Sequence, residues 1–237
     1  VVAIQRHLFV SAFARASLLK DAGVGGGDTA SVNGAILGNG ISPTCVPPAY
    51  GVKKRPNSVI YASNPSRGLE KLLKAWPRVL EEVPDAHLTV CCEWRVMLLA
   101  QQHEPGFPIM AQLRALQELL ANSPSTTNLG WLPQEKLIKV FQETCVYAYP
   151  GYAMPEGFGV SLVQAQACGC SVVAPPAGAL PEVLCPGCTH WMNDDTVLAQ
   201  VVVSALKTSV KHIHSGFHHW PAVAQRFLAA VEASPCT

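Results

Sequence analysis

The chain has 237 residues, and its 17 Lys or Arg against 16 Asp or Glu give a formal net charge of +1. This balance argues against a strongly basic surface that binds nucleic acid. Hydrophobic residues make up 49% of the chain and charged residues 14%, a composition that excludes intrinsic disorder. Because about a quarter of the residues of an ordinary soluble domain are charged, we expect part of the surface to be covered by something else.

The predicted elements alternate between short apolar runs and longer runs of helical period, a pattern typical of βαβ units around a parallel sheet. In chain order they are a helix at His7–Ala22, a strand at Ser31–Leu37, a strand at Ser58–Ala62, a helix at Arg67–Glu82, a strand at His87–Cys92, a helix at Ile109–Leu120, a strand at Thr126–Leu129, a helix at Pro133–Gln142, a strand at Cys145–Tyr149, a helix at Gly159–Cys168, a strand at Ser171–Ala174, and helices at Asp194–Lys207 and Pro221–Ala233. The glycines at 25–27 are predicted to be a flexible loop or a helix end, and the segment Glu104–Pro108 is a predicted loop. One doubly wound domain is the expected fold.

The cellular location is predicted from cysteine usage and hydropathy. No apolar run reaches the ~18 to 20 residues of a membrane-spanning helix, and the start of the chain has no signal-peptide pattern. Several of the nine cysteines lie in apolar runs, where a thiol behaves as a small hydrophobe. We therefore expect a soluble intracellular protein, in the cytoplasm or an organelle interior. Because the chain begins with Val1 rather than Met, we also expect a processed product or a section of something longer.

The most informative stretch is 148–174. It predicts a buried strand, a loop rich in proline and glycine, and a helix that begins near Gly159. Ligands of open α/β sheets bind beyond the carboxyl ends of the strands, so Glu156 and the backbone N–H groups of Gly157, Phe158 and Gly159 should face that crevice. The free N–H groups and the dipole of the helix start favour a phosphate there.

This stretch resembles the retaining glycosyltransferases of family 4, the GT-B enzymes that take a sugar from a nucleotide diphosphate sugar. Their nucleotide-binding half carries a glutamate, then Gly-Phe-Gly, a second glutamate eight residues after the first, and Ala-x-Ala-x-Gly-x-Pro-Val-Val-Ala. The residues that match in register are Glu156, Gly157, Phe158, Gly159, Ala165, Ala167, Gly169, Val172, Val173 and Ala174. The second glutamate is replaced by Gln164.

The resemblance covers nearly the whole chain. Further similar segments are Asn39–Ile41, Tyr61–Glu70, Leu129–Leu132, Ala177–Glu182 and Trp220–Phe227. The implied fold is α/β, with a Rossmann-like parallel sheet flanked by helices, the C-terminal half of a GT-B glycosyltransferase. The implied division is residues 1–45 as an interdomain segment with the first strand of that half, and residues 46–237 as the nucleotide-sugar-binding domain with C-terminal helices.

The resemblance also implies roles for individual residues. It gives Glu156 a catalytic position near the donor sugar. It also implies that Arg67 binds the diphosphate, a role that suits its always ionised, forked guanidinium group. Gly157, Phe158 and Gly159 complete the donor-binding set. Gln164 takes the position that accepts hydrogen bonds from the ribose, with a loss of about 1 kcal/mol because its amide oxygen is uncharged.

Simpler interpretations of the same side chains stay open. Glu156 could be a loop carboxylate that caps a helix, and Arg67 a solvated residue at a helix start. Gln164 could be an ordinary half-buried polar residue. Glu182 is interpreted as a helix-start carboxylate rather than a catalyst.

Two functions follow. The first is retaining hexosyl transfer from a nucleotide diphosphate sugar, with no metal and no cofactor besides that donor. The half that would supply acceptor contacts is absent from this sequence, so transfer would need it from the same gene product or another chain. The second is a non-catalytic glycosyltransferase-like module, a structural or interaction subunit of a larger assembly, which Gln164 and the low charge favour. Neither involves nucleic acid or a transmembrane segment.

Two other clusters carry weaker hypotheses. Cys185 and Cys188, with His190 nearby, suggest zinc or redox chemistry, but zinc needs four ligands and a redox dithiol should open a helix. A histidine cluster is interrupted by Gly216 and is predicted to be a solvated loop. Its members are His212, His214, His218 and His219.

Overall fold

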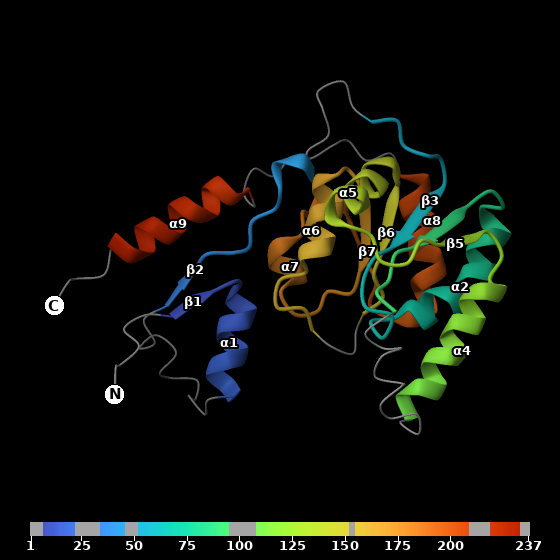
Figure 1. Ribbon diagram of the computed structural model, residues 1–237, viewed down its shortest axis with the longest axis horizontal. Helices are drawn as coiled ribbons and strands as arrows, with labels where there is room; N and C mark the ends of the chain where they lie inside the picture. The colour runs from blue at the N-terminus through green and yellow to red at the C-terminus, as the bar shows by residue number, and fades with distance from the viewer. Residues whose placement is uncertain are drawn as a thin grey trace.

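The computed structural model describes residues 7–21, 34–45, 52–94, 108–151, 155–208 and 219–232 (Figure 1). Its main sheet has six parallel strands: β3 (Ser58–Tyr61), β4 (His87–Val90), β5 (Thr126–Asn128), β6 (Val146–Ala148), β7 (Ser171–Ala174) and β8 (Thr189–Trp191). The strand order is β5-β4-β3-β6-β7-β8. The chain therefore winds outward from β3 in one direction and from β6 in the other, which confirms the predicted α/β fold.

Helices cover both faces of this sheet. One face carries α2 (Leu69–Glu82), α4 (Pro108–Asn122) and α8 (Leu198–Lys207), and the other carries α5 (Gln134–Glu143), α6 (Val160–Ala167) and α7 (Leu180–Val183). Successive side chains of a strand point to opposite faces, so Val59 and Tyr61 enter the first core while Ile60 enters the second. All four residues of β3 are buried, as expected for a parallel strand between two helical layers.

The amphipathic pattern of α2 shows why these helices dock. Five of its apolar residues recur at helical spacing and are buried, namely Leu69, Leu72, Leu73, Trp76 and Val79. The indole Nε1–H of Trp76 donates a hydrogen bond to the carbonyl of Pro124 at 3.0 Å, which satisfies the one polar atom of that side chain. The predicted bounds of the helices over 69–82, 108–122, 134–143, 160–167 and 220–232 agree with the structure to within two residues.

Lys54 joins the ends of two helices on one face of the sheet. Its ammonium group donates hydrogen bonds to the carbonyls of Phe141 at 3.1 Å and Thr144 at 2.7 Å, at the end of α5, and to Cys168 at 2.9 Å, at the end of α6. The last carbonyls of a helix have no partner within the helix, and a cation there also suits the helix dipole. Lys54 therefore fixes α6, the helix that follows Glu156.

A smaller unit lies beside the main sheet. Strands β1 (His7–Phe9) and β2 (Gly34–Ile36) pair in parallel, and α1 (Ala12–Asp21) follows β1. The α9 helix (Trp220–Glu232) lies on the β1–β2 side, away from the main sheet (Figure 1). The guanidinium Nε–H of Arg226 on α9 donates to the carbonyl of Leu37 at 2.7 Å.

The first predicted helix, His7–Ala22, is wrong at its start. Residues His7–Phe9 form β1, and the helix begins at Ala12 because the Ser11 hydroxyl accepts a hydrogen bond from the Ala14 N–H at 2.9 Å. The predicted strand Ser31–Leu37 corresponds to β2, which pairs with β1 and not with the six-stranded sheet. Residues 31–33, the glycines at 25–27 and residues 104–107 lie outside the described residues.

Several further features were not predicted, among them the short helix α7. The predicted helix Asp194–Lys207 opens with a 3-10 turn, Asp195–Val197, because the Asp194 carboxylate accepts from the Thr196 N–H at 2.6 Å, and α8 begins only after it. Short 3-10 turns also occur at Pro43–Cys45 and Pro186–Cys188, and β8 forms an unpredicted edge strand. Within the described ranges, no helix is both long and apolar enough to cross a bilayer.

Candidate functional site

The site lies where the strand order of the main sheet reverses. Strands β3 and β6 are neighbours at its centre, and the chain leaves them toward opposite sides. In open α/β sheets the loops that follow two such strands diverge and leave a crevice at their carboxyl ends. Arg67 follows β3, while Tyr149 and Glu156 follow β6, so the topology brings these three residues to the same edge.

Arg67, Tyr149 and Glu156 form one hydrogen-bonded cluster. Arg67 Nη1 forms an ion pair with Glu156 Oε1 and also donates to the Tyr149 hydroxyl at 3.3 Å. The Tyr149 hydroxyl in turn donates to Glu156 Oε1 at 2.6 Å. The side chains of Arg67 and Glu156 are 29% and 17% exposed, and Tyr149 is fully buried. Two of the predicted site residues thus meet at a third that the sequence analysis treated only as the end of a strand.

The cluster holds its charges in a half-buried setting. The hydrogen bond to Tyr149, followed by the charge of Glu156, raises the pKa of Arg67, which therefore stays a cation. Burial, followed by the hydrogen bond to Glu156, raises the pKa of Tyr149 to about 12. At neutral pH Tyr149 is therefore an uncharged donor between an anion and a cation.

Two glycines allow the loops of the site to approach one another. Gly68 has a φ of +96°, and a Cβ there would lie 2.5 Å from the carbonyl oxygen of Pro150. The loop after β6 therefore packs directly on the start of α2. Gly178 has a φ of +62°, and a Cβ there would lie 2.5 Å from the Glu156 carbonyl oxygen. The Ala179 N–H donates to that same oxygen at 2.8 Å, which fixes the backbone of Glu156.

The other predicted donor-binding residues lead from Glu156 into α6. The Gly157 carbonyl accepts a hydrogen bond from the Ser11 hydroxyl at 2.6 Å, and Phe158 is buried. Gly159 precedes the helix with a φ of +79°, and Gln164 is half-buried on α6. In the described part of the chain, the Gln164 side chain makes no hydrogen bond to Arg67 or Glu156. Gly157, Phe158 and Gly159 therefore lie between Glu156 and the start of α6, and Gln164 lies further along that helix.

Glu182 lies in the first turn of α7, which confirms the predicted helix-start position, and its carboxylate caps another helix, α1. The carboxylate accepts from the N–H groups of Ala12 at 3.0 Å and Phe13 at 2.9 Å, the first residues of α1. A carboxylate at a helix start satisfies free N–H groups and suits the dipole. Together with the Ser11 bond to Gly157, this contact joins the β1–β2 unit to the site loops.

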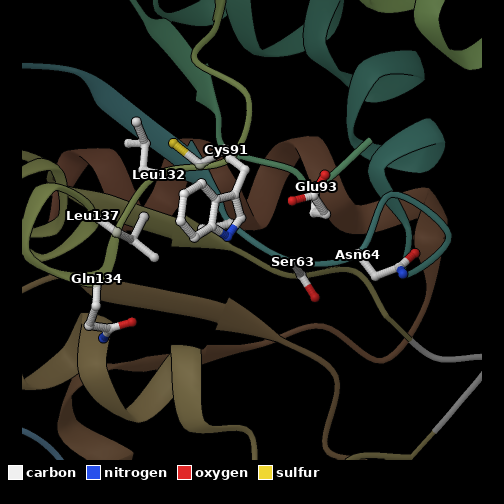
Figure 2. A pocket seen from close by; sticks show the side chains of 9 residues that line it. Ser63, Asn64, Cys91, Glu93, Leu132, Gln134 and Leu137 are labelled. Atoms are coloured by element: carbon white, nitrogen blue, oxygen red, sulfur yellow. The ribbon is translucent and has the colours of Figure 1, made fainter. Parts of the chain in front are cut away.

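A pocket of about 390 Å³ lies at the same edge of the sheet (Figure 2). Its walls are the loops after β3, β4 and β5 and the start of α5, with lining residues Ala62, Ser63, Asn64, Cys91, Glu93, Trp131, Leu132, Gln134 and Leu137. Figure 2 shows Cys91, Leu132 and Leu137 on one side of the pocket and Glu93 and Asn64 on the other. Burial raises the pKa of Cys91 to about 12, so its thiol belongs to the uncharged side.

The pocket adds residues that the sequence analysis missed. The turn at Leu129–Leu132 was among the similar segments, but Glu93 was not, and its position just beyond a buried strand was the available signal. Asn64 belongs to a closed turn, since its carbonyl accepts from the Arg67 N–H at 2.9 Å. The pocket and the Arg67 cluster therefore share one short segment of chain.

The two weaker clusters stay separate from this site. Cys185 N–H donates to the side-chain oxygen of Gln166 at 2.9 Å, and burial raises the pKa of Cys188 to about 11. Among the described residues, no three His, Cys, Asp or Glu are grouped as metal ligands. Of the predicted histidine cluster, His212, His214 and His218 lie outside the described residues, and His219 forms an isolated bridge with Ile41.

Replacing Tyr149 with phenylalanine should lower the free energy of unfolding by about 1 to 3 kcal/mol, because the lost hydroxyl bonds two charged groups. Urea denaturation measures this change. Tyr61→Phe is the matched control, since within the described ranges its hydroxyl donates to the neutral Asn64 carbonyl and to no charged group, and it should lose about 1 kcal/mol or less. Equal losses in the two variants would contradict a charge-assisted role for Tyr149.

The doubly wound parallel sheet flanked by helices is shared with solved structures of GT-B glycosyltransferases. Sucrose-phosphate synthase from Thermosynechococcus elongatus superposes with a TM-score of 0.65 at 16% identity, over 98% of this chain and 60% of its own. Anabaena HepE in complex with UDP-glucose gives a TM-score of 0.65 at 15% identity, over 96% of this chain and 63% of its own.

Residues 47–208 match the model of the family described as glycosyl transferases group 1. The match covers more than half of the chain, and the protein belongs to this family. A similar curated protein is a GDP-mannose-dependent phosphatidylinositol monomannoside mannosyltransferase from Corynebacterium glutamicum, 26% identical over 64% of this chain and 38% of its own length. A D-inositol 3-phosphate glycosyltransferase from a Mycobacterium species is 30% identical over 50% of this chain and 29% of its own length. The matches thus span less than two fifths of these relatives.

Proposed function

We propose that this chain is the donor-binding half of a retaining glycosyltransferase that transfers a hexose from a nucleotide diphosphate sugar. The observation that carries the proposal is the Arg67–Tyr149–Glu156 cluster at the point where the sheet reverses, beside the start of α6. Family membership supports the reaction class, and the resemblance in the sequence supports retention and the assignment to the C-terminal half.

The diphosphate has two sets of donors in this proposal. Both bonds of Arg67 within the described residues use Nη1, which leaves the N–H groups of Nε and Nη2 for phosphate oxygens. Residues Gly157 to Gly159 and the start of α6 follow β6 at the same edge, and the N–H groups of a helix start favour an anion. Because negative charge on the leaving diphosphate grows in the transition state, these fixed donors accelerate transfer more than they strengthen binding.

Glu156 orients the donor sugar. Its Oε1 is held by Arg67 and Tyr149, while its main chain is held by Ala179, so the carboxylate is placed before any ligand arrives. A carboxylate accepts hydrogen bonds from sugar hydroxyls through its remaining lone pairs. Preorganisation of this kind is what positions a reacting sugar.

The nucleoside occupies the pocket of Figure 2 and the surface toward Gln164. Trp131, which lines the pocket, is 63% exposed and offers an aromatic face on which a base can stack. Gln164 accepts a hydrogen bond from a ribose hydroxyl. The Corynebacterium relative is named for GDP-mannose and the HepE structure contains UDP-glucose, which supports a nucleotide diphosphate sugar as donor without choosing its base.

The acceptor half is supplied by further sequence of the same protein or by another chain. The β1–β2 unit supports this, because Leu8 and Ile36 on its two described strands and Leu18 on α1 are exposed apolar side chains. The coverage of 29 to 38% of the curated relatives supports it as well. The boundary near residue 45 stays a prediction.

Isothermal titration calorimetry with UDP-glucose and GDP-mannose tests the proposal. Micromolar binding of at least one of them to the purified chain is the expected result. Binding that is absent or millimolar would overturn it and support the second candidate, a non-catalytic module that keeps the fold as an interaction subunit. Gln164, where the resembling enzymes carry a glutamate, is the observation that favours this second candidate.

Gln164→Glu should strengthen binding of the preferred donor by about 5- to 10-fold, because a charged acceptor replaces a neutral one at the ribose. Calorimetry on the variant measures the change. Gln200→Glu adds the same charge at an exposed position of α8 and should leave affinity unchanged. If Gln164→Glu binds no better than the original chain, residue 164 does not contact the ribose.

A further inference from the structure

We propose that the pocket of Figure 2 selects guanine, so that the donor is a guanosine diphosphate sugar and Glu93 is the residue that recognises its base. This inference rests on the proposed function, since it takes the pocket as the place of the donor's base. It goes further in naming the class of donor and the side chain that determines it.

The pocket walls have one acidic side and one apolar side. Glu93 is half-buried, follows β4 and is the one acidic side chain among the described lining residues. Figure 2 shows it on the same side as Asn64, opposite Cys91, Leu132 and Leu137. A planar base that enters between these two sides places its apolar face on carbon atoms and sulfur, and its polar edge toward a carboxylate.

The side-chain amide of Asn64 has a defined orientation. Its side-chain oxygen accepts hydrogen bonds from the Ser66 N–H at 3.0 Å and the Ser66 hydroxyl at 2.7 Å. These bonds assign the positions of the side-chain oxygen and nitrogen of Asn64. The NH₂ group is therefore the part of Asn64 that can donate a hydrogen bond at the pocket rim. The polar side of the pocket thus offers one fixed donor and one charged acceptor.

Guanine matches this arrangement. Its edge carries two adjacent donors, N1–H and the N2 amino group, followed by the O6 acceptor. A carboxylate accepts two parallel N–H groups in a bidentate pair, and such charge-assisted pairs are the stronger hydrogen bonds. Glu93 therefore pairs with N1–H and N2–H, and the Asn64 amino group donates to O6.

The other bases leave an unfavourable contact at the carboxylate. Uracil presents a single N–H between two carbonyls, so the second oxygen of Glu93 would face another acceptor. Adenine and cytosine place a ring nitrogen lone pair next to their amino group, with the same result. A site built for a hydrogen bond rejects analogues that cannot make it, and an advantage of at least about tenfold for guanine is the expected scale.

The turn that carries Asn64 also links base recognition to the phosphates. The Arg67 N–H donates to the Asn64 carbonyl at 2.9 Å, and the Tyr61 hydroxyl donates to the same oxygen at 2.7 Å. The base-recognising amide and the diphosphate-binding guanidinium are therefore held on one closed turn, three residues apart in the chain. A single nucleotide diphosphate reaches both.

Calorimetry of the full 237-residue chain with GDP, UDP and ADP tests the inference. GDP should bind at least about tenfold more tightly than UDP or ADP. In Glu93→Gln the advantage of GDP over UDP should fall to about threefold or less, because a glutamine presents an amino group to one of the two guanine donors. Glu135→Gln removes the same charge at an exposed neighbouring position on α5 and should keep the original preference.

The outcomes separate this inference from the proposed function. Binding of UDP or ADP as tight as that of GDP overturns guanine selection and leaves donor binding intact. Binding of none of the three nucleotides by the folded chain overturns both. An unchanged preference in Glu93→Gln removes Glu93 from base recognition. The preference of the original chain for GDP over UDP and ADP is enough to test guanine selection. A variant that fails to fold therefore does not prevent the test.

Discussion

Replacing Arg67 with alanine should weaken binding of the preferred nucleotide diphosphate sugar at least about 100-fold, or about 2.7 kcal/mol. Two effects combine. The diphosphate loses its forked cationic donor, and the Glu156 carboxylate, which is only 17% exposed, loses its counter-charge close to an incoming anion. Calorimetry with the original chain and the variant, side by side, measures the loss.

Two further variants separate charge from geometry in this prediction. Arg67→Lys keeps the positive charge but not the planar fork, and should lose about tenfold. Arg78→Ala removes an exposed arginine of α2 outside the site and should leave donor affinity unchanged. Donor affinity in Arg67→Ala that is unchanged within threefold would show that the guanidinium serves only to hold Glu156 in the free protein.

The central strands could be predicted from sequence because their signal is local and strong. A parallel strand covered by helices on both faces is a continuous apolar run, as in β3 and β7, and both were predicted to within one residue. The two missed strands have three residues each. β1 was hidden in a run of helical period, and β8 is an edge strand of half-buried residues that starts directly after the Cys185–Cys188 segment. Three residues are too few to establish a period of two.

The candidate site was predicted residue by residue but not as a cluster. Arg67 and Glu156 come from separate motifs, and they are 89 positions apart. Their ion pair depends on β3 lying beside β6, and the strand order is a non-local property that local sequence does not encode. Tyr149 read as the last apolar residue of a strand, because nothing in its neighbours shows where its hydroxyl points. Glu93 is a single acid after a strand, and only its place in the pocket distinguishes it.

Replacing Gly178 with alanine should lower the free energy of unfolding by about 2 to 5 kcal/mol and weaken donor binding. The φ of +62° costs an alanine about 1 to 2 kcal/mol. Its Cβ would also lie 2.5 Å from the Glu156 carbonyl oxygen and 2.7 Å from the Glu156 nitrogen. Both atoms are main chain and cannot rotate away, so the backbone must shift at a further cost of about 1 to 3 kcal/mol.

Gly130→Ala is the matched control, because Gly130 has a φ of +65° and an added Cβ would meet nothing within 4 Å. Urea denaturation of both variants should show a loss of about 1 to 2 kcal/mol for Gly130→Ala and the larger loss for Gly178→Ala. Both variants carry the strain of a positive φ, so the difference between their two losses of unfolding free energy measures the cost of the contact with Glu156 alone. If the two losses are equal, the 177–179 segment shifts at little cost to accommodate the methyl group. Such a segment would not hold the Glu156 carboxylate in the position that binding of a donor sugar requires.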